Sequence, residues 1–144
     1  FDEPWDGPNN RRLHGLAMPV YHCPGGPPSR ATNYLAVIGP RTVWQGQKTT
    51  RLSDIADGPS NTLLVVEVAK SGIHWMEPRD LHVLQMARGI NPKAGQGISS
   101  IHPGCANVSL ADGSVRFLPD DFPPDLLDSL LSIDGGEKTD SERW

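Results

Sequence analysis

The sequence predicts an α+β fold, in which an antiparallel sheet carries a strand over residues 62–68 and a hairpin over residues 107–118. A C-terminal helix is expected to pack on this sheet, and long ordered loops are expected to connect the elements. Three observations predict this fold: a continuous apolar run bounded by turn signals, an Asp-Gly turn between alternating segments, and leucines repeating on one helical face. At 144 residues, the chain is expected to form one globular domain over residues 1–144.

Glycine and proline, with 15 and 14 copies, make the chain rich in turns. Collagen is excluded because there is no G-X-Y period, and wholesale disorder is excluded because strand-like apolar runs separate the Gly/Pro clusters. Residues 1–33 are expected to be irregular, since each proline removes a backbone donor and disfavours helix at the residue before it. The polar tail at residues 137–144 is expected to be frayed.

Short β-like runs open the sheet region at residues 33–40 and 42–44. One helical turn is expected at residues 53–55, before the turn-forming residues Asp57, Gly58 and Pro59. Residues 62–70 are rich in β-branched and apolar side chains, which favours a buried strand over a helix.

A short helix is predicted at residues 78–87, because Pro78 stands near its start and Leu81, Leu84 and Met86 follow. The glycine-containing segment at residues 89–100 is expected to return to loop.

The hairpin at residues 107–118 is the clearest local signal in the chain. Val108 and Leu110 alternate with polar residues before Asp112 and Gly113, and Val115 and Phe117 alternate after them. An Asp-Gly pair in this position is typical of a type I′ turn, in which both central residues need φ > 0.

The C-terminal helix is predicted at residues 125–134. Pro124 marks its start, the glycines at 135 and 136 mark its end, and its apolar face is formed by leucines 126, 127, 130 and 131.

The charge of the chain argues against nucleic acid as a partner, and its hydropathy argues against a membrane-spanning segment. The net charge is −4, the pI is about 5.6, and Arg11 and Arg12 are the one adjacent basic pair. A nucleic-acid binder needs a clustered positive face, so nucleic acid is not expected as a partner. No apolar stretch approaches the ~20 residues needed to cross a bilayer.

The two cysteines, Cys23 and Cys105, leave three interpretations open. They could form a disulfide, which requires an oxidising compartment. With His22 and His102 they could bind zinc, although adjacent side chains such as His22 and Cys23 diverge on an extended chain. Either cysteine could also act as a nucleophile with His102 as base, but neither stands in a recognisable activating context.

Other candidate binding residues lie near turns. A calcium site could draw on five oxygen-bearing side chains, although acidic residues in turns more often bond local backbone: Asp54, Asp57, Asn61, Glu67 and Asp112. Trp5, Trp44 and Trp75 could stack on sugars or partner surfaces, or could fill the core of a loop-rich domain.

His102 and Asp112 are a further candidate binding pair, because they flank the start of the hairpin and its turn. His102 could be a ligand or an acid–base group. The favoured alternative is that its ring nitrogens bond loop carbonyls and fix the entry to the hairpin. An enzyme centred on His102 is the least favoured function, and no catalytic residue is assigned.

A histidine, nine residues and then Asp-Gly, from His102 to Gly113, resembles the H-x(9)-D-G element of a large family of prepilin-type proteins abundant in planctomycete bacteria. The resemblance extends over nearly the whole chain. Its other motifs, in order, are PWD at 4–6, NNR at 9–11, MPVYHCP at 18–24, YLAVIGP at 34–40, DGPSNT at 57–62, VVE at 65–67, WMEPRDL at 75–81 and GGE at 135–137. One departure is Cys105, which stands where a glycine is usual, so a Cys23–Cys105 bridge would be a private feature of this chain.

The resemblance implies a pilin-like sheet and a precursor with a short basic leader and an N-terminal hydrophobic helix, both absent from this chain. Such proteins look like pseudopilins of type II secretion or type IV pilus systems. Their domain is otherwise of unknown function and is sometimes labelled solute-binding-like.

The expected function is therefore that of a non-enzymatic, extracytoplasmic head domain, periplasmic or at the cell surface. Its expected partners are proteins such as other pilin-like subunits, with membrane contact through the missing helix alone. The alternative is a ligand-binding module for carbohydrate, peptide or calcium. No cofactor is expected apart from a possible calcium ion.

Overall fold

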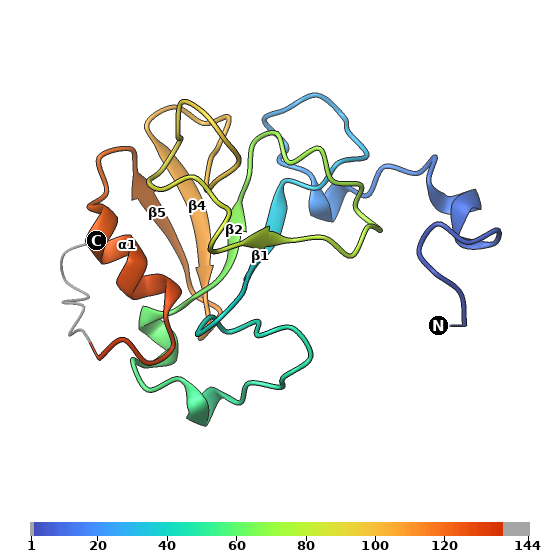
Figure 1. Ribbon diagram of the computed structural model, residues 1–144. Coiled ribbons are helices and arrows are strands. Elements are labelled where there is room, and N and C mark those ends of the chain that lie inside the picture. Colours follow the sequence, from blue (N-terminus) through green and yellow to red (C-terminus); the bar gives the residue numbers. More distant parts are fainter. Residues whose placement is uncertain (1, 137–144) are drawn as a thin grey trace.

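A five-stranded sheet organises the protein in the computed structural model, which describes residues 2–136 (Figure 1). The strand order is β3-β1-β2-β4-β5, and a single α-helix, α1, follows the last strand. The α+β class is confirmed. The elements are β1 (Tyr34–Ile38), β2 (Leu63–Glu67), β3 (Leu81–His82), β4 (Cys105–Leu110), β5 (Val115–Pro119) and α1 (Pro124–Leu131).

The sheet is antiparallel from β1 through β5, as expected, and one parallel strand is added at its edge. β1 pairs with β2, β2 with β4 and β4 with β5 in antiparallel register, whereas the short β3 runs parallel to β1. The sheet is therefore mixed rather than wholly antiparallel.

The two faces of the sheet differ in character because side chains alternate along each strand. One face carries the main hydrophobic core, which includes Leu35, Val66, Val108 and Leu118. The helix α1 contributes Leu127, Leu130 and Leu131 to this core and runs alongside β4 and β5 in Figure 1.

The apolar helix face expected near the C-terminus is confirmed: Leu127, Leu130 and Leu131 are buried, and Leu126 packs against the core. The helix begins at Pro124 and ends before the expected glycines. Ser132 takes an extended conformation, and the Ile133 N–H donates to the Arg41 carbonyl instead of continuing the helix.

The hairpin of β4 and β5 is confirmed, but the expected turn type is wrong. The Gly113 N–H donates to the Leu110 carbonyl, and Gly113 has φ +85°, whereas Asp112 has no positive φ. This is a type I turn followed by a left-handed glycine, a three-residue hairpin loop. The Leu110 N–H donates to the Ser114 carbonyl and closes this loop, and the Asp112 carboxylate accepts the Ser114 N–H within it.

The predicted helix at residues 78–87 is wrong. Leu81 and His82 form β3 beside β1, and residues 83–86 continue as a turn and a bend. Pairing satisfies backbone groups at the edge of β1, which a helix would leave unpaired, and Leu84 is 75% exposed rather than part of an apolar face. Pairing with β1 therefore overrides the helical spacing of the apolar residues in this segment.

The remaining segments are short turns and loops. A 3₁₀ turn at Leu52–Asp54 matches the expected helical turn, while Trp44 makes a single β-bridge to Ile38 rather than a strand. Within the first 33 residues, 3₁₀ turns occur at Asn10–Leu13 and Pro19–Tyr21. Another precedes β2 at Pro59–Asn61.

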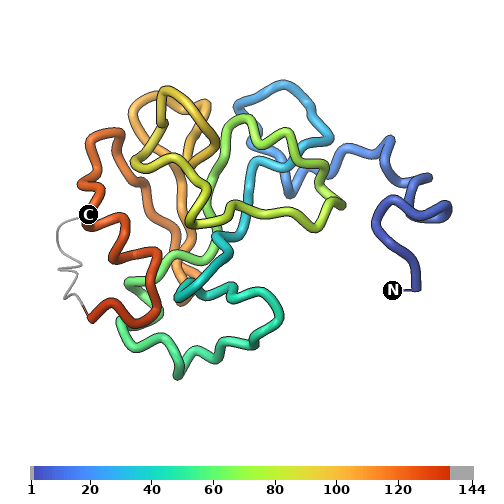
Figure 2. The backbone as a smooth tube through the Cα atoms, viewed as in Figure 1, coloured from blue at the N-terminus to red at the C-terminus, as the bar shows by residue number. Residues whose placement is uncertain are grey.

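The N-terminal arm, residues 2–17, extends away from the sheet, as the tube in Figure 2 shows. The expected frayed tail at 137–144 lies outside the described residues. No helix within residues 2–136 has the length and apolar character needed to span a membrane.

Replacement of Leu130 tests the packing of α1. Leu130 is fully buried, so Leu130→Ala should lower the free energy of unfolding by about 2–5 kcal/mol through lost burial and a residual cavity. Leu126→Ala, at a partly buried position of the same helix, is the matched control and should cost markedly less. Urea denaturation measures both changes, provided that the slope of the unfolding free energy against urea concentration stays the same. Equal decreases in the free energy of unfolding for the two variants would contradict the assigned helix face.

Candidate functional site

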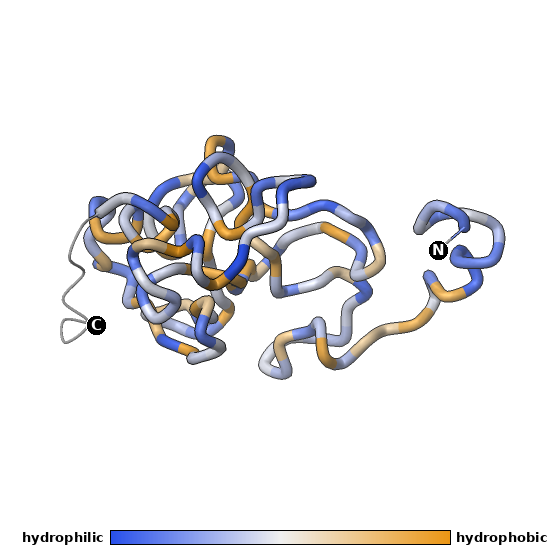
Figure 3. Tube along the Cα trace, turned by 90° about the horizontal axis from the view of Figure 1, so that it is seen from below, coloured by the Kyte–Doolittle hydropathy of each residue, from blue (hydrophilic) through white to orange (hydrophobic). Residues whose placement is uncertain are grey.

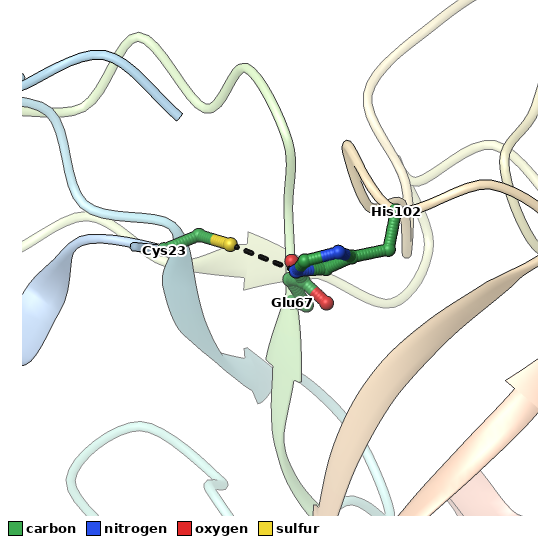
Figure 4. A group of neighbouring side chains, drawn as sticks. All are labelled: Cys23, Glu67 and His102. Atoms are coloured by element: carbon green, nitrogen blue, oxygen red, sulfur yellow. Dashed lines mark hydrogen bonds between the residues drawn. The ribbon is translucent and has the colours of Figure 1, made fainter. Parts of the chain in front are cut away.

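Three potential metal-ligating side chains, Cys23, Glu67 and His102, meet on the face of the sheet opposite α1. Their ligand atoms all lie within 4.8 Å of one another. Cys23 Sγ and His102 Nε2 are 3.3 Å apart, and a dashed line marks this contact in Figure 4. Cys23 and Glu67 are buried, at 2% and 1% exposure, whereas His102 is exposed. We refer to these residues as the Cys-Glu-His cluster.

Glu67 belongs to the last position of β2, and its carboxylate is held by three neutral donors. Ser100 Oγ donates to one oxygen over 2.7 Å, and Asn107 donates to the other from Nδ2 over 2.8 Å and from its backbone N–H over 3.1 Å. A buried carboxylate needs such donors because it has left water. The carboxylate is thus fixed in position, yet all these partners are uncharged.

Asn33 holds the Cys23 backbone in place. Its Oδ1 accepts the Cys23 N–H over 3.0 Å, while its Nδ2 donates to the carbonyls of Val68 and Ala69. The Asn33 N–H also donates to the Tyr21 carbonyl. One asparagine therefore ties the loop containing Cys23 to the segment that directly follows β2.

His102 is positioned by a serine and a glycine. Ser100 Oγ accepts the His102 N–H over 3.0 Å and donates to Glu67, so one hydroxyl connects two members of the cluster. Gly25 leaves space for the imidazole: a Cβ at this position would lie 3.0 Å from His102 Cε1. A side chain at position 25 would therefore crowd the imidazole ring of His102.

Tyr34 lies close enough to the cluster to respond to its acidic groups. Burial raises the pKa of the Tyr34 phenol, and the nearby acidic groups Cys23 and Glu67 raise it further. A buried carboxylate and a buried thiol that lie close together are chemically suited to bind a cation.

The interpretations of the cysteines and of His102 are partly corrected. Cys23 and Cys105 are both free thiols in the structure rather than a disulfide. Of the four residues considered for zinc, Cys23 and His102 come together, whereas His22 bonds the Pro27 carbonyl through Nε2. The His102 ring lies against the Cys23 thiol, not against loop carbonyls as favoured from the sequence.

The calcium candidates do not gather into one site. Asp57 accepts the N–H groups of Gly135 and Gly136, Asp54 accepts the Arg51 N–H, and Asn61 donates to the Asp57 carbonyl. Asp112 accepts both the N–H and the hydroxyl of Ser114. Within residues 2–136, Glu67 is the one calcium candidate that joins a group of three potential ligands from His, Cys, Asp and Glu.

Two of the three tryptophan candidates lie in one aromatic cluster. Trp5 stacks on His14 and His74, and Trp75 stacks on Tyr21 and contacts His74. These rings attach the N-terminal arm to the loop after residue 73. Trp44 lies elsewhere and donates from Nε1 to the Leu64 carbonyl.

Sequence reasoning missed the residues that complete the cluster: Gly25, Asn33, Ser100 and Asn107, together with the partnership of Glu67 with Cys23 and His102. One signal was present. Glu67 interrupts the apolar run of residues 62–70, and a glutamate is almost never fully buried unless it is paired.

Comparison with known proteins finds a match between part of the chain and one family model, and it assigns no activity. A family model described as a protein of unknown function (DUF1559) matches residues 69–125, which is less than half of the chain. The match includes His102 and the hairpin, and it supports the resemblance to a family of unknown function. No curated protein and no solved structure matches the chain.

Asp112 should contribute a pH dependence to stability. Hydrogen bonds from the Ser114 hydroxyl and N–H lower its pKa from the ordinary value of 3.8, so folding favours the ionised carboxylate. This contribution is present above pH 3.8 and is lost as the pH falls through the folded-state pKa. The free energy of unfolding measured from pH 6 to about pH 2 should therefore fall less steeply in Asp112→Asn than in the wild type.

The control for this pH series is Asp134→Asn. Arg41 and Ser132 lower the pKa of Asp134 at an independent position, so the two substitutions should act additively. If the free energy of unfolding fell equally with decreasing pH in the wild type and in Asp112→Asn, this would contradict the role of Ser114.

Proposed function

We propose that this chain is the non-enzymatic head domain of an exported, pseudopilin-like protein of a type II secretion or pilus-like assembly. In this proposal its sheet packs against an apolar N-terminal helix of the same protein, and its loops face protein partners outside the cytoplasm. The observation that carries the proposal is a face of the sheet, opposite α1, on which the exposed side chains of Val115 and Phe117 are apolar; we refer to it as the open face.

The open face consists of two rows of side chains defined by the strand register. Ala36, Val65, Ser109 and Val115 form one row across β1, β2, β4 and β5. The other row contains Tyr34, Asn107 and Phe117, with the buried Glu67 between Tyr34 and Asn107. Val115 and Phe117 are 59% and 68% exposed, and the other named members apart from Glu67 are partly buried.

The chemistry of this face suits a helix. Small side chains at Ala36 and Ser109 allow a close approach, while the ring of Phe117 offers an aromatic anchor. Exposed apolar side chains gathered on one side of a sheet commonly mark an interaction surface. Because the main core lies on the other face, a helix could dock here without displacing α1.

A non-enzymatic role also agrees with the state of Cys23. A catalytic thiol must reach its substrate, whereas Cys23 is 2% exposed and lies beneath the His102 ring. The ligand-binding alternative finds little support in two of the three tryptophans, since Trp5 and Trp75 are engaged in attaching the N-terminal arm, whereas Trp44 is exposed.

The gene provides the first test. The reading frame upstream of Phe1 is expected to encode a short basic leader followed by about 20 apolar residues, the length of a membrane-spanning helix. Sequencing the complete reading frame checks this directly. A full-length protein without any such apolar segment would refute the pseudopilin proposal.

Replacement of Phe117 tests the open face itself. Phe117→Ser should change the free energy of unfolding of this domain by no more than about 0.5 kcal/mol, because the ring is exposed. In the full-length protein, loss of the aromatic anchor should reduce the amount recovered in sheared cell-surface assemblies by about tenfold or more.

Arg116→Ser is the matched control, because Arg116 is the exposed neighbour of Phe117 on the opposite side of β5. It should leave the sheared fraction unchanged. Equal recovery of Phe117→Ser and the wild type would argue against docking through this face.

A further inference from the structure

The distances within the Cys-Glu-His cluster fit a tetrahedral zinc ion. Zinc bonds of about 2.3 Å to sulfur and about 2.0 Å to nitrogen place the two ligand atoms about 3.5 Å apart at a tetrahedral angle. Cys23 Sγ and His102 Nε2 are 3.3 Å apart, and a Glu67 oxygen lies within 4.8 Å of both. Cys23 Sγ and His102 Nε2 need to separate by only about 0.2 Å to reach this spacing.

The charges of the cluster balance those of a divalent cation. Binding would release the Cys23 thiol proton to solvent, so that a thiolate and the Glu67 carboxylate together carry two negative charges. Both side chains are buried, and the donors around Glu67 are neutral. A Zn²⁺ ion would make the site neutral overall, which removes the cost of an uncompensated buried charge.

The ligand types select zinc over calcium and magnesium. Thiolate and imidazole are preferred by zinc, whereas calcium and magnesium take oxygen ligands. Three protein ligands leave one tetrahedral position for water, and the exposed His102 gives access from solvent.

The surroundings of the cluster resemble the outer shell of a metal site. Ser100 and Asn107 orient the Glu67 carboxylate, and Ser100 also holds the His102 backbone. Asn33 fixes Cys23 from the opposite side, and Gly25 leaves room for the imidazole. Every ligand is thus positioned by a specific neighbour.

We propose that Cys23, Glu67 and His102 bind one Zn²⁺ ion, which cross-links the loop at Cys23, the end of β2 and the loop at His102. Cys23 and His102 are 79 positions apart in the sequence, so the ion ties together distant segments of the folded domain. The site does not depend on the docking proposal: it concerns one end of the sheet and needs no partner.

Metal titration of the purified chain tests the site. Protein stripped with EDTA and freed of chelator is titrated with ZnCl₂ by calorimetry, and bound metal is counted by mass spectrometry after dialysis. One ion per chain is expected, together with a higher melting temperature in zinc. Co²⁺ as a substitute should show a thiolate charge-transfer band and the visible bands of tetrahedral cobalt.

Substitution of each ligand should weaken zinc binding more than 100-fold: Cys23→Ser, Glu67→Gln and His102→Gln. Ser100→Ala should weaken it by about 10-fold to 100-fold, as is typical of residues that orient a ligand. Glu67→Gln preserves the shape of the side chain, and His102→Gln alters an exposed residue, so His102→Gln remains informative if a buried variant fails to fold. Circular dichroism confirms the fold of each.

Cys105→Ser and His22→Gln are the matched controls, since each removes the same ligand type next to the cluster without removing a proposed ligand. Both should bind zinc as the wild type does. Absence of stoichiometric binding by the folded wild type would overturn the proposal. So would wild-type affinity in folded His102→Gln, or a loss in Cys105→Ser and His22→Gln as large as in the ligand variants.

Discussion

Burial of the Glu67 carboxylate at the end of β2 constrains much of this structure. A carboxylate in the interior must be hydrogen-bonded by donors that cannot move away, and Ser100 and Asn107 supply them. Asn107 does so partly through its backbone N–H, so the side chain of Glu67 takes the place of a ladder acceptor between β2 and β4. The path of residues 99–107 thereby depends on a single side chain of the central strand.

The same strand end connects the two faces of the sheet. Val66 points into the core shared with α1, whereas Glu67 points to the opposite face, where Cys23 and His102 cover it. Asn107 stands between the Cys-Glu-His cluster and Phe117 in one row of the open face. The hydropathy colouring in Figure 3 shows apolar stretches within the body of the domain and a polar end on the N-terminal arm.

Local signals were sufficient for much of the fold and insufficient for the cluster. The strands, the hairpin and α1 follow from apolar patterning and turn residues that act over a few positions. Leu81 instead joins β3 because the edge of β1 is available, a fact that no local pattern contains. Cys23, Glu67 and His102 come from three separate segments, and their meeting depends on β2 lying between β1 and β4. The unusual glutamate in an apolar strand was visible, but its partners were not.

The aromatic cluster also determines which parts of the protein open together. The described contacts of the N-terminal arm with the rest of the domain include rings, such as Trp5 on His74, and hydrogen bonds from the side chains of His74 and Trp75 to the carbonyls of His14 and Leu16. The arm contributes no strand to the sheet, so its release breaks no ladder hydrogen bond. Detachment of the arm and global unfolding are therefore separate equilibria. Amide protons of the arm exchange with solvent through whichever of these two openings requires less free energy.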